Sequence, residues 1–285
     1  MTQWKPGPDA EFDEYARYFE VDRRRIELAL ERLSSGNLSH LAALDASLAR
    51  AMILSGAPKP STTMATADAA ASGCAAALSS TFGSAGLHVC LRRSSGRTFL
   101  VRDSATHALH PMAWLTTLSC AILAGCDEIG ESLARPRVIL NALRNIEEHA
   151  RPTWTALALY WRELANGPGA PDYAVLERAA DRPNSDHTAK RLQLTLLLPT
   201  LRLAASLTSE DDFAFASVVS DELRALRGRT NCESLLPVLA LVTKAAAMGR
   251  PLPAAVEALA PLDASMQSRR PSAHLRFPDE WLWHL

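Results

Sequence analysis

The sequence has few aromatic residues, almost no net charge and no long apolar run. Only 6% of its 285 residues are aromatic, and 31 acidic residues nearly balance 30 basic ones. A protein that binds nucleic acid through the phosphates needs a basic excess, so nucleic acid is not an expected partner. The most apolar stretch, Leu192 to Leu207, contains Pro199 and Arg202, whereas a membrane span needs about 20 apolar residues. A membrane is therefore not an expected partner either.

Cysteines are few and widely separated. The sequence contains Cys74, Cys90, Cys120, Cys126 and Cys232. No two of them have the Cys-x-x-Cys spacing of redox or zinc motifs, so reduced, buried thiols are expected. The first residues lack the apolar stretch of a secretory signal. These features predict a cytoplasmic protein.

Patterns typical of an enzyme are also missing. The sequence has no glycine-rich phosphate loop followed by lysine and no Gly-x-Ser-x-Gly motif. His107 and His110 have a spacing that metal ligands can adopt, but among nearby carboxylates only Asp103 accompanies them. We therefore predict a protein that is not an enzyme and has no catalytic, cofactor or metal site. A hydrolase or metal enzyme assembled from Asp103, His107, His110 and Glu128 is the alternative.

Helical patterns fill most of the chain. Alanine and leucine dominate the composition, which favours helices packed through small and γ-branched side chains. Leu41, Leu44, Leu48 and Met52 recur at helical spacing and precede Gly56. Residues 62–82 are rich in alanine and serine, so a helix there must pack either very closely or hardly at all.

One segment has a different texture. The β-prone runs Leu87 to Arg93 and Arg97 to Arg102 flank the turn Ser94-Ser95-Gly96, a pattern typical of a β-hairpin. An isolated hairpin is marginally stable in water. We therefore expect this hairpin to lie against helices.

These patterns predict a mostly α-helical fold: a compact array of about ten helices with one small β-hairpin near residues 87–102. We expect a single domain over residues 1–285. Its N-terminal helices lie at 9–82, its helical body at 111–260, and its C-terminal tail, 261–285, packs back onto the body. The packing of the tail is expected because it contains large aromatic side chains that would be costly to expose.

Two acidic groups are candidate partner-binding residues. They are Asp127, Glu128 and Glu131, and then Glu210, Asp211 and Asp212. Most such runs are solvated faces or helix caps. The functional alternative is an acidic face that binds a basic partner, because complementary charge steers association.

The succession of elements resembles the immunity-49 family of bacterial polymorphic-toxin immunity proteins. The elements that carry the resemblance are the hairpin at Leu87 to Arg102, the Trp114 helix ending in Cys126-Asp127, the Tyr160-Trp161 helix, the Pro199 helix, the Phe213 helix, Leu235-Leu236-Pro237 and Phe277-Pro278-Asp279-Glu280-Trp281-Leu282.

This resemblance implies an all-helical bacterial protein that binds and neutralises a cognate toxin domain. Such a protein is made beside the toxin gene and protects its producer during competition between bacteria. The alternative is a helical scaffold or adaptor of tetratricopeptide-like character. It is motivated by predicted helix pairs such as Trp154 to Leu164 with Tyr173 to Ala180.

Overall fold

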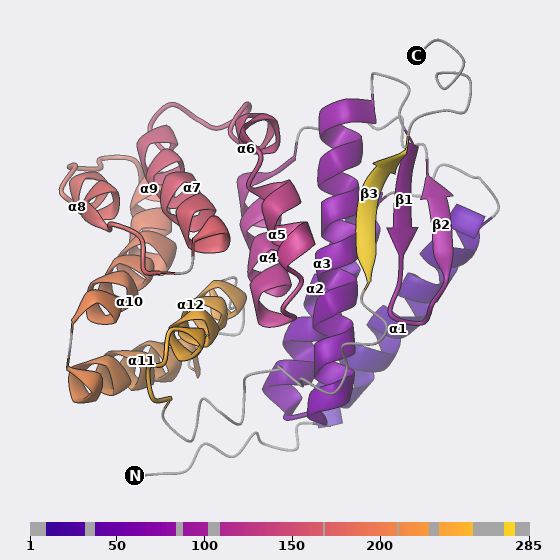
Figure 1. Ribbon diagram of the computed structural model, residues 1–285, viewed down its shortest axis with the longest axis horizontal. Coiled ribbons are helices and arrows are strands. Elements are labelled where there is room, and N and C mark those ends of the chain that lie inside the picture. Colours follow the sequence, from indigo (N-terminus) through magenta and orange to yellow (C-terminus); the bar gives the residue numbers. More distant parts are fainter. Residues whose placement is uncertain are drawn as a thin grey trace. The chain divides into compact units, whose positions relative to one another are not determined.

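The computed structural model describes residues 10–31, 38–83, 88–101, 109–167, 169–209, 211–227, 234–252 and 271–276. This part of the chain is mostly helical and contains one small antiparallel sheet, which confirms the predicted fold class (Figure 1). The chain divides into two compact units. Unit 1 comprises Met1–Ala142 and Pro261–Leu285, and unit 2 comprises Leu143–Ala260. A single domain over the whole chain stays a prediction.

Unit 1 contains six helices and three strands among the described residues. They are α1 (Ala10–Glu31), α2 (Leu38–Ser55), α3 (Lys59–Phe82), β1 (His88–Arg92), β2 (Thr98–Val101), α4 (Pro111–Leu123), α5 (Asp127–Leu133), α6 (Pro136–Ala142) and β3 (Ser272–Arg276). The predicted helix through Leu41 and Leu48 is α2, and both of these side chains are buried. Gly56 follows α2 with a φ of 68°, a left-handed conformation that glycine adopts without strain at a helix end.

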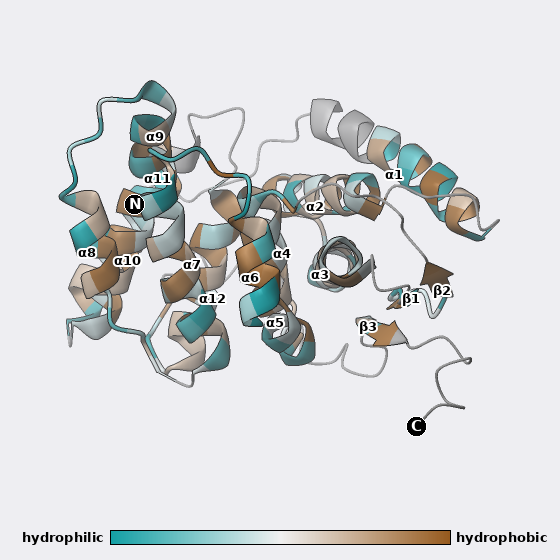
Figure 2. Cartoon of the chain, turned by 90° about the horizontal axis from the view of Figure 1, so that it is seen from above, coloured by the Kyte–Doolittle hydropathy of each residue, from teal (hydrophilic) through white to brown (hydrophobic). Residues whose placement is uncertain are grey.

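Helix α3 forms the centre of unit 1. Figure 2 shows this helix nearly end-on, with α2, α4 and the sheet on different sides of it. Its alanine and serine side chains are buried along most of its length. A Cβ atom added at Gly73 would lie 2.2 Å from Thr117 Oγ1 of α4. Of the two alternatives for residues 62–82, close packing is therefore the one that the structure adopts.

The predicted hairpin is confirmed and carries a third strand. Strands β1 and β2 pair antiparallel with Val89 opposite Val101, and Gly96 lies in the turn with a φ of 83°. Strand β3 pairs with the other edge of β1, which gives the strand order β2-β1-β3. Both β1 and β3 contact α3, so the sheet lies against a helix as expected. Part of the tail thus joins unit 1, whereas residues 261–270 and 277–285 lie outside the described residues.

The regular secondary structure in the described part of unit 2 is helical. It contains α7 (Arg151–Asn166), α8 (Ala174–Ala180), α9 (His187–Leu192), the π-helical turn η2 (Gln193–Leu197), α10 (Leu198–Thr208), α11 (Asp212–Arg227) and α12 (Leu235–Ala247). The predicted helix from His187 to Leu207 is the continuous run of α9, η2 and α10. The N–H of Leu198 bonds to the carbonyl of Gln193, a wider π turn that directly precedes Pro199, which has no N–H to donate.

None of the helices in the described ranges is long and apolar enough to cross a membrane. The cysteine prediction is confirmed for the four cysteines in these ranges, Cys74, Cys90, Cys120 and Cys126, which are buried and form no disulfide with one another. Cys232 lies outside the described residues. Burial raises the pKa of the Cys74 and Cys120 thiols to about 12, so both are protonated and unreactive at neutral pH.

Candidate functional site

An arginine lies fully buried at the turn of the hairpin. Arg93 follows β1 directly, and its backbone N–H donates to the carbonyl of Arg97 at 2.9 Å. Gly96 closes the turn by donating to the carbonyl of Arg93 at 2.9 Å. The side chain of Arg93 is only 1% exposed. Because a buried guanidinium is costly unless it is paired, this position requires carboxylate partners.

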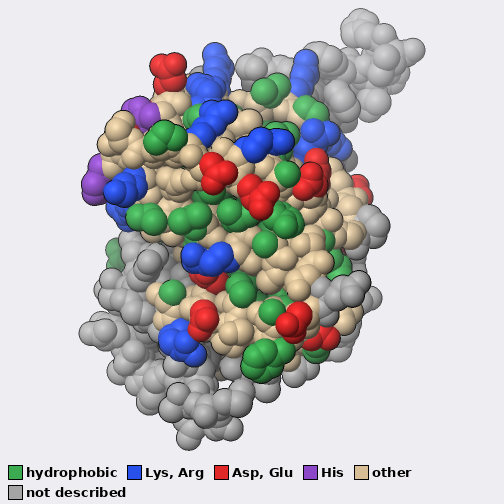
Figure 3. Space-filling model, turned by 90° about the vertical axis from the view of Figure 1, so that its left-hand side faces the viewer, with side chains coloured by type: hydrophobic (Ala, Val, Ile, Leu, Met, Phe, Trp, Pro, Cys, Tyr) green, Lys and Arg blue, Asp and Glu red, His purple; other side chains and the backbone are tan. Residues whose placement is uncertain are grey.

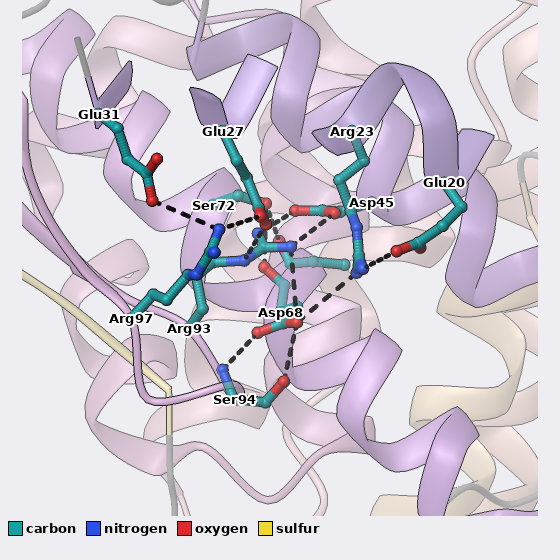
Figure 4. A network of polar contacts seen from close by, with 11 residues as sticks. Glu20, Arg23, Glu27, Glu31, Asp45, Asp68, Ser72, Arg93, Ser94 and Arg97 are labelled. Carbon is teal, nitrogen blue, oxygen red and sulfur yellow. Dashed lines mark hydrogen bonds and ion pairs between the residues drawn. The ribbon is translucent and has the colours of Figure 1, made fainter. Parts of the chain in front are cut away.

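Three helices supply those partners, as Figure 4 shows. Asp45 of α2 accepts hydrogen bonds from both terminal nitrogens of Arg93 in a bidentate pair, with 2.9 Å between Nη2 and Oδ1. Asp68 Oδ2 of α3 lies 3.5 Å from Arg93 Nη2, and Glu27 Oε1 of α1 lies 3.3 Å from Arg93 Nε. The hairpin is thereby tied to α1, α2 and α3 through one side chain.

Further contacts complete this arrangement. Ser94 donates to Asp68 through its backbone N–H at 2.7 Å and through its hydroxyl at 2.9 Å. Arg23 of α1 lies 3.9 Å from Asp68 and bonds to Glu20 at 2.6 Å. We call Arg93, its three carboxylates and Arg23 the anchor cluster. Two of these five residues, Glu27 and Arg23, belong to α1 and fix it to the hairpin and to α3.

The charges of the anchor cluster depend on one another. Burial favours the neutral form of Arg93, but the carboxylates of Asp45, Asp68 and Glu27 outweigh this effect and raise the pKa of Arg93. Burial raises the pKa of Glu27 and of Asp68, against the opposing effect of Arg93. Two arginines therefore face three carboxylates, two of which bind a proton more readily than they do in water.

The pKa of Glu27 gives a pH-dependent prediction. Since this pKa lies above its ordinary value of 4.5 in the folded protein, the stability that Glu27 contributes is complete below about pH 4.5 and is lost as pH rises through the folded pKa. The glutamine of a Glu27→Gln variant has no proton to gain or lose in this pH range. The free energy of unfolding of this variant, relative to the wild type, is expected to increase as pH rises above 4.5, measured by urea unfolding at a series of pH values.

The exposed carboxylate of Glu131 provides the matched control variant, Glu131→Gln. The charged groups that face Glu27 are Arg93, Arg23, Arg97, Asp45 and Asp68. The same titration series in an Asp68→Asn variant separates the effect of Glu27 from that of Asp68. A difference between Glu27→Gln and the wild type that decreases with rising pH would contradict the assignment.

The other side of α1 carries large apolar side chains in solvent. Tyr18, Val21 and Leu28 are 65%, 55% and 40% exposed. Spacings of three and seven residues place them on one side of a helix, opposite buried Leu30. Figure 2 shows α1 lying along α2. Helix α1 is thus held by its inner side and presents apolar side chains on its outer side.

The sequence-predicted acidic residues lie in different parts of the chain. Asp127, Glu128 and Glu131 are exposed on α5 in unit 1. Asp211 accepts hydrogen bonds from the N–H groups of Phe213 and Ala214 at 2.9 and 3.0 Å, which caps α11 of unit 2.

The remaining acidic residues of that second group have different positions. Asp212 pairs with Arg250 at 2.6 Å, and Glu210 lies outside the described residues. Capping and pairing therefore account for Asp211 and Asp212, and a partner-binding role for all six acidic residues stays a prediction.

The residues of the enzyme alternative are only partly described. Asp103 and His107 lie outside the described residues. His110 caps α4, where its Nδ1 accepts the N–H of Met112 at 3.2 Å, and Glu128 is exposed on α5. Among the described residues no group of three or more histidine, cysteine, aspartate and glutamate side chains could hold a metal ion.

Exposed apolar side chains of unit 2 are spread over several elements. They are Leu159 of α7, Leu194 of η2 and Phe213 of α11. Figure 3 shows one face of the molecule, on which hydrophobic, basic and acidic side chains are intermixed. Helices α7 and α8, the predicted pair, do contact each other. However, α7 has 16 residues and α8 has 7, whereas a helical repeat has two helices of similar length. The tetratricopeptide-like scaffold or adaptor stays a prediction.

The chain matches no protein-family model, no curated protein and no solved structure. Its resemblance to the immunity-49 family therefore stays a prediction based on the succession of elements.

Proposed function

We propose that this protein is an immunity protein, which binds and neutralises a cognate bacterial toxin domain in the cytoplasm without catalysis. The observation that carries the proposal is the exposure of Tyr18, Val21 and Leu28 on one side of α1. Exposed tyrosine and aliphatic side chains that gather on one rigid surface are typical of protein-binding sites. The resemblance to the immunity-49 family gives the class of partner.

The anchor cluster supports this function by fixing the exposed helix before a partner arrives. Glu27 and Arg23 tie α1 to the hairpin and to α3. A surface that is already ordered loses less conformational entropy on binding than a mobile segment does. The buried charges therefore have a role in positioning, and the apolar side chains of α1 make the contact.

Protection of cells is the expected result of expressing this protein. The probe is the C-terminal toxin domain of a large secreted protein encoded beside this gene. Cells that express the toxin domain should grow when the wild-type chain is co-expressed, and a catalytically inactive form of the domain should co-purify with the chain. Growth that is not rescued, together with no co-purification, would overturn the proposal.

A matched pair of variants tests the contribution of α1. Tyr18→Ala with Val21→Ala is expected to weaken toxin binding by roughly tenfold or more, because tyrosine contacts often dominate protein interfaces. Leu140→Ala removes a similarly exposed apolar side chain from α6 and should leave binding unchanged. Binding constants are measured by isothermal titration calorimetry with the inactive toxin domain.

A further inference from the structure

Three of the four arginines in residues 17–31 of α1 lie on the same side of the helix. Arg17, Arg24 and Arg25 are exposed, and helical spacing places them on the same side as Tyr18, Val21 and Leu28. Together these six residues form what we call the outer face of α1. Among the side chains that the structure describes, none forms an ion pair with Arg17 or Arg24. Arg25 lies 3.6 Å from Asp22, and 77% of its side chain is exposed.

Over residues 17–31, where the structure describes the side chains of α1, its carboxylates are paired with arginines. Glu27 contacts Arg93, Glu31 lies 3.3 Å from Arg97, and Glu20 bonds to Arg23. These pairs neutralise the acidic side chains along the inner side and the flank of the helix. Over residues 17–31 the outer face therefore carries more positive than negative charge, although the whole chain has a net charge of −1.

We propose that the outer face of α1 binds an acidic protein surface, namely that of the toxin domain. This inference rests on the proposed function and adds the arginines of the interface and the acidic character of the surface that it binds. Arginine guanidinium groups bind carboxylates through two parallel hydrogen bonds, and tyrosine and arginine are both enriched among the residues that contribute most to binding at protein interfaces. The surface differs in position and in sign from the acidic residues that the sequence predicts as binding residues.

The arrangement of the outer face favours a protein over a lipid surface. A helix that lies in a membrane interface keeps its apolar residues together on one side and its basic residues on the other. On α1, Arg25 lies between Tyr18 and Val21 around the helix, as its spacing from them shows. Inserting Val21 and Tyr18 into lipid would carry this guanidinium with them. A protein partner can instead place a carboxylate opposite each arginine.

The first experiment uses a defined acidic probe and the full chain. The probe is a fluorescent amphipathic helical peptide of leucine and glutamate, and its counterpart contains lysine in place of glutamate. The Arg17→Glu, Arg24→Glu double variant is expected to bind the acidic peptide roughly tenfold or more weakly at 0.1 M salt. This loss should shrink at 1 M salt, where the Debye length falls from about 10 to about 3 Å.

The control variant has the same change in charge at other sites. Arg137 of α6 and Arg162 of α7 are exposed, and Arg137→Glu with Arg162→Glu should leave binding of the acidic peptide within about twofold of the wild type. Circular dichroism confirms that both double variants are folded. Equal losses in the two double variants, or equal binding of the lysine peptide, would overturn the proposal.

The second experiment separates this proposal from the proposed function. It measures binding of the inactive toxin domain to the wild type and to both double variants. Binding that only the Arg17→Glu, Arg24→Glu variant loses supports both proposals. Binding that both double variants retain overturns the outer face as the interface and leaves the immunity function standing. Binding of the acidic peptide without any binding of the toxin domain overturns the immunity function and the toxin domain as partner, and leaves standing only that the outer face binds acidic protein surfaces.

A third arm tests the lipid surface directly. The wild type and the double variants are sedimented with vesicles of phosphatidylcholine and phosphatidylserine. No co-sedimentation is expected for any of the three proteins. Arginine-dependent co-sedimentation, together with no binding of the acidic peptide, would overturn the proposal and assign the outer face of α1 to anionic membranes.

Discussion

An Arg93→Met variant is expected to lose about 3–5 kcal/mol of the free energy of unfolding, because removing one partner of a buried ion pair leaves the others uncompensated. Methionine keeps most of the length of the side chain, so the loss reflects charge more than volume. Asp45, Asp68 and Glu27 would then lie close together, and the described cations left beside them would be Arg23 and the half-exposed Arg97. Urea unfolding followed by far-UV circular dichroism measures the effect.

Arg97→Met is the matched control on the same hairpin. Arg97 pairs with Glu31 and Glu27, but its side chain is 51% exposed, so the loss should be about 1 kcal/mol or less. Hydrogen exchange adds a local readout. In Arg93→Met the amides of α1 should exchange faster, since the contact between Glu27 and Arg93 is lost. Equal losses of stability in the two variants would show that Arg93 does not anchor the unit.

A Gly73→Ala variant is expected to be destabilised by about 1–3 kcal/mol, the usual cost of extra volume in a packed core. The added Cβ would meet Thr117 Oγ1 at 2.2 Å and Thr117 Cγ2 at 2.5 Å, so α3 and α4 would have to move apart. This direction is opposite to the usual one, because alanine stabilises a helix by about 1 kcal/mol relative to glycine. Thermal and urea unfolding measure the change.

Gly130→Ala is the matched control for this substitution. Gly130 is also helical, in α5, and a Cβ atom added there meets nothing within 4 Å. This variant should be neutral or up to about 1 kcal/mol more stable than the wild type. Adding Thr117→Ala to Gly73→Ala removes the two closest contacts and should restore part of the lost stability. A stabilising effect of Gly73→Ala alone would contradict the close packing of α3 on α4.

Local signals in the sequence were sufficient for much of the fold. The spacing of Leu41 and Leu48 predicts α2, and Ser94-Ser95-Gly96 predicts the turn between β1 and β2. Strand β3 was missed because Ser272–Arg276 contains no β-branched residue and only Ala273 and Leu275 alternate with its polar residues, which is a weak local signal. Its position depends on pairing with β1, a contact between segments far apart in the chain, and no local pattern records such a contact.

The anchor cluster was missed for a related reason. Its carboxylates come from three separate helices, whereas the predicted acidic sites were chosen because their residues are adjacent in sequence. One signal was present. Asp45 follows Leu41 and Leu44 and precedes Leu48, on the apolar side of α2, where an aspartate requires a buried cation. The sequence offered several arginines for that role, and only the fold selects Arg93.

The pairing of β3 with β1 has a consequence for the order in which the protein folds during synthesis. Residues 143–260, which form unit 2, are synthesised between the two parts of unit 1. The helices and hairpin of unit 1 leave the ribosome early, but the sheet gains its third strand only after Arg276 has emerged. Until then one edge of β1 is open to other strands. Nascent chains halted before residue 272 should therefore rely more on chaperones than the finished protein does.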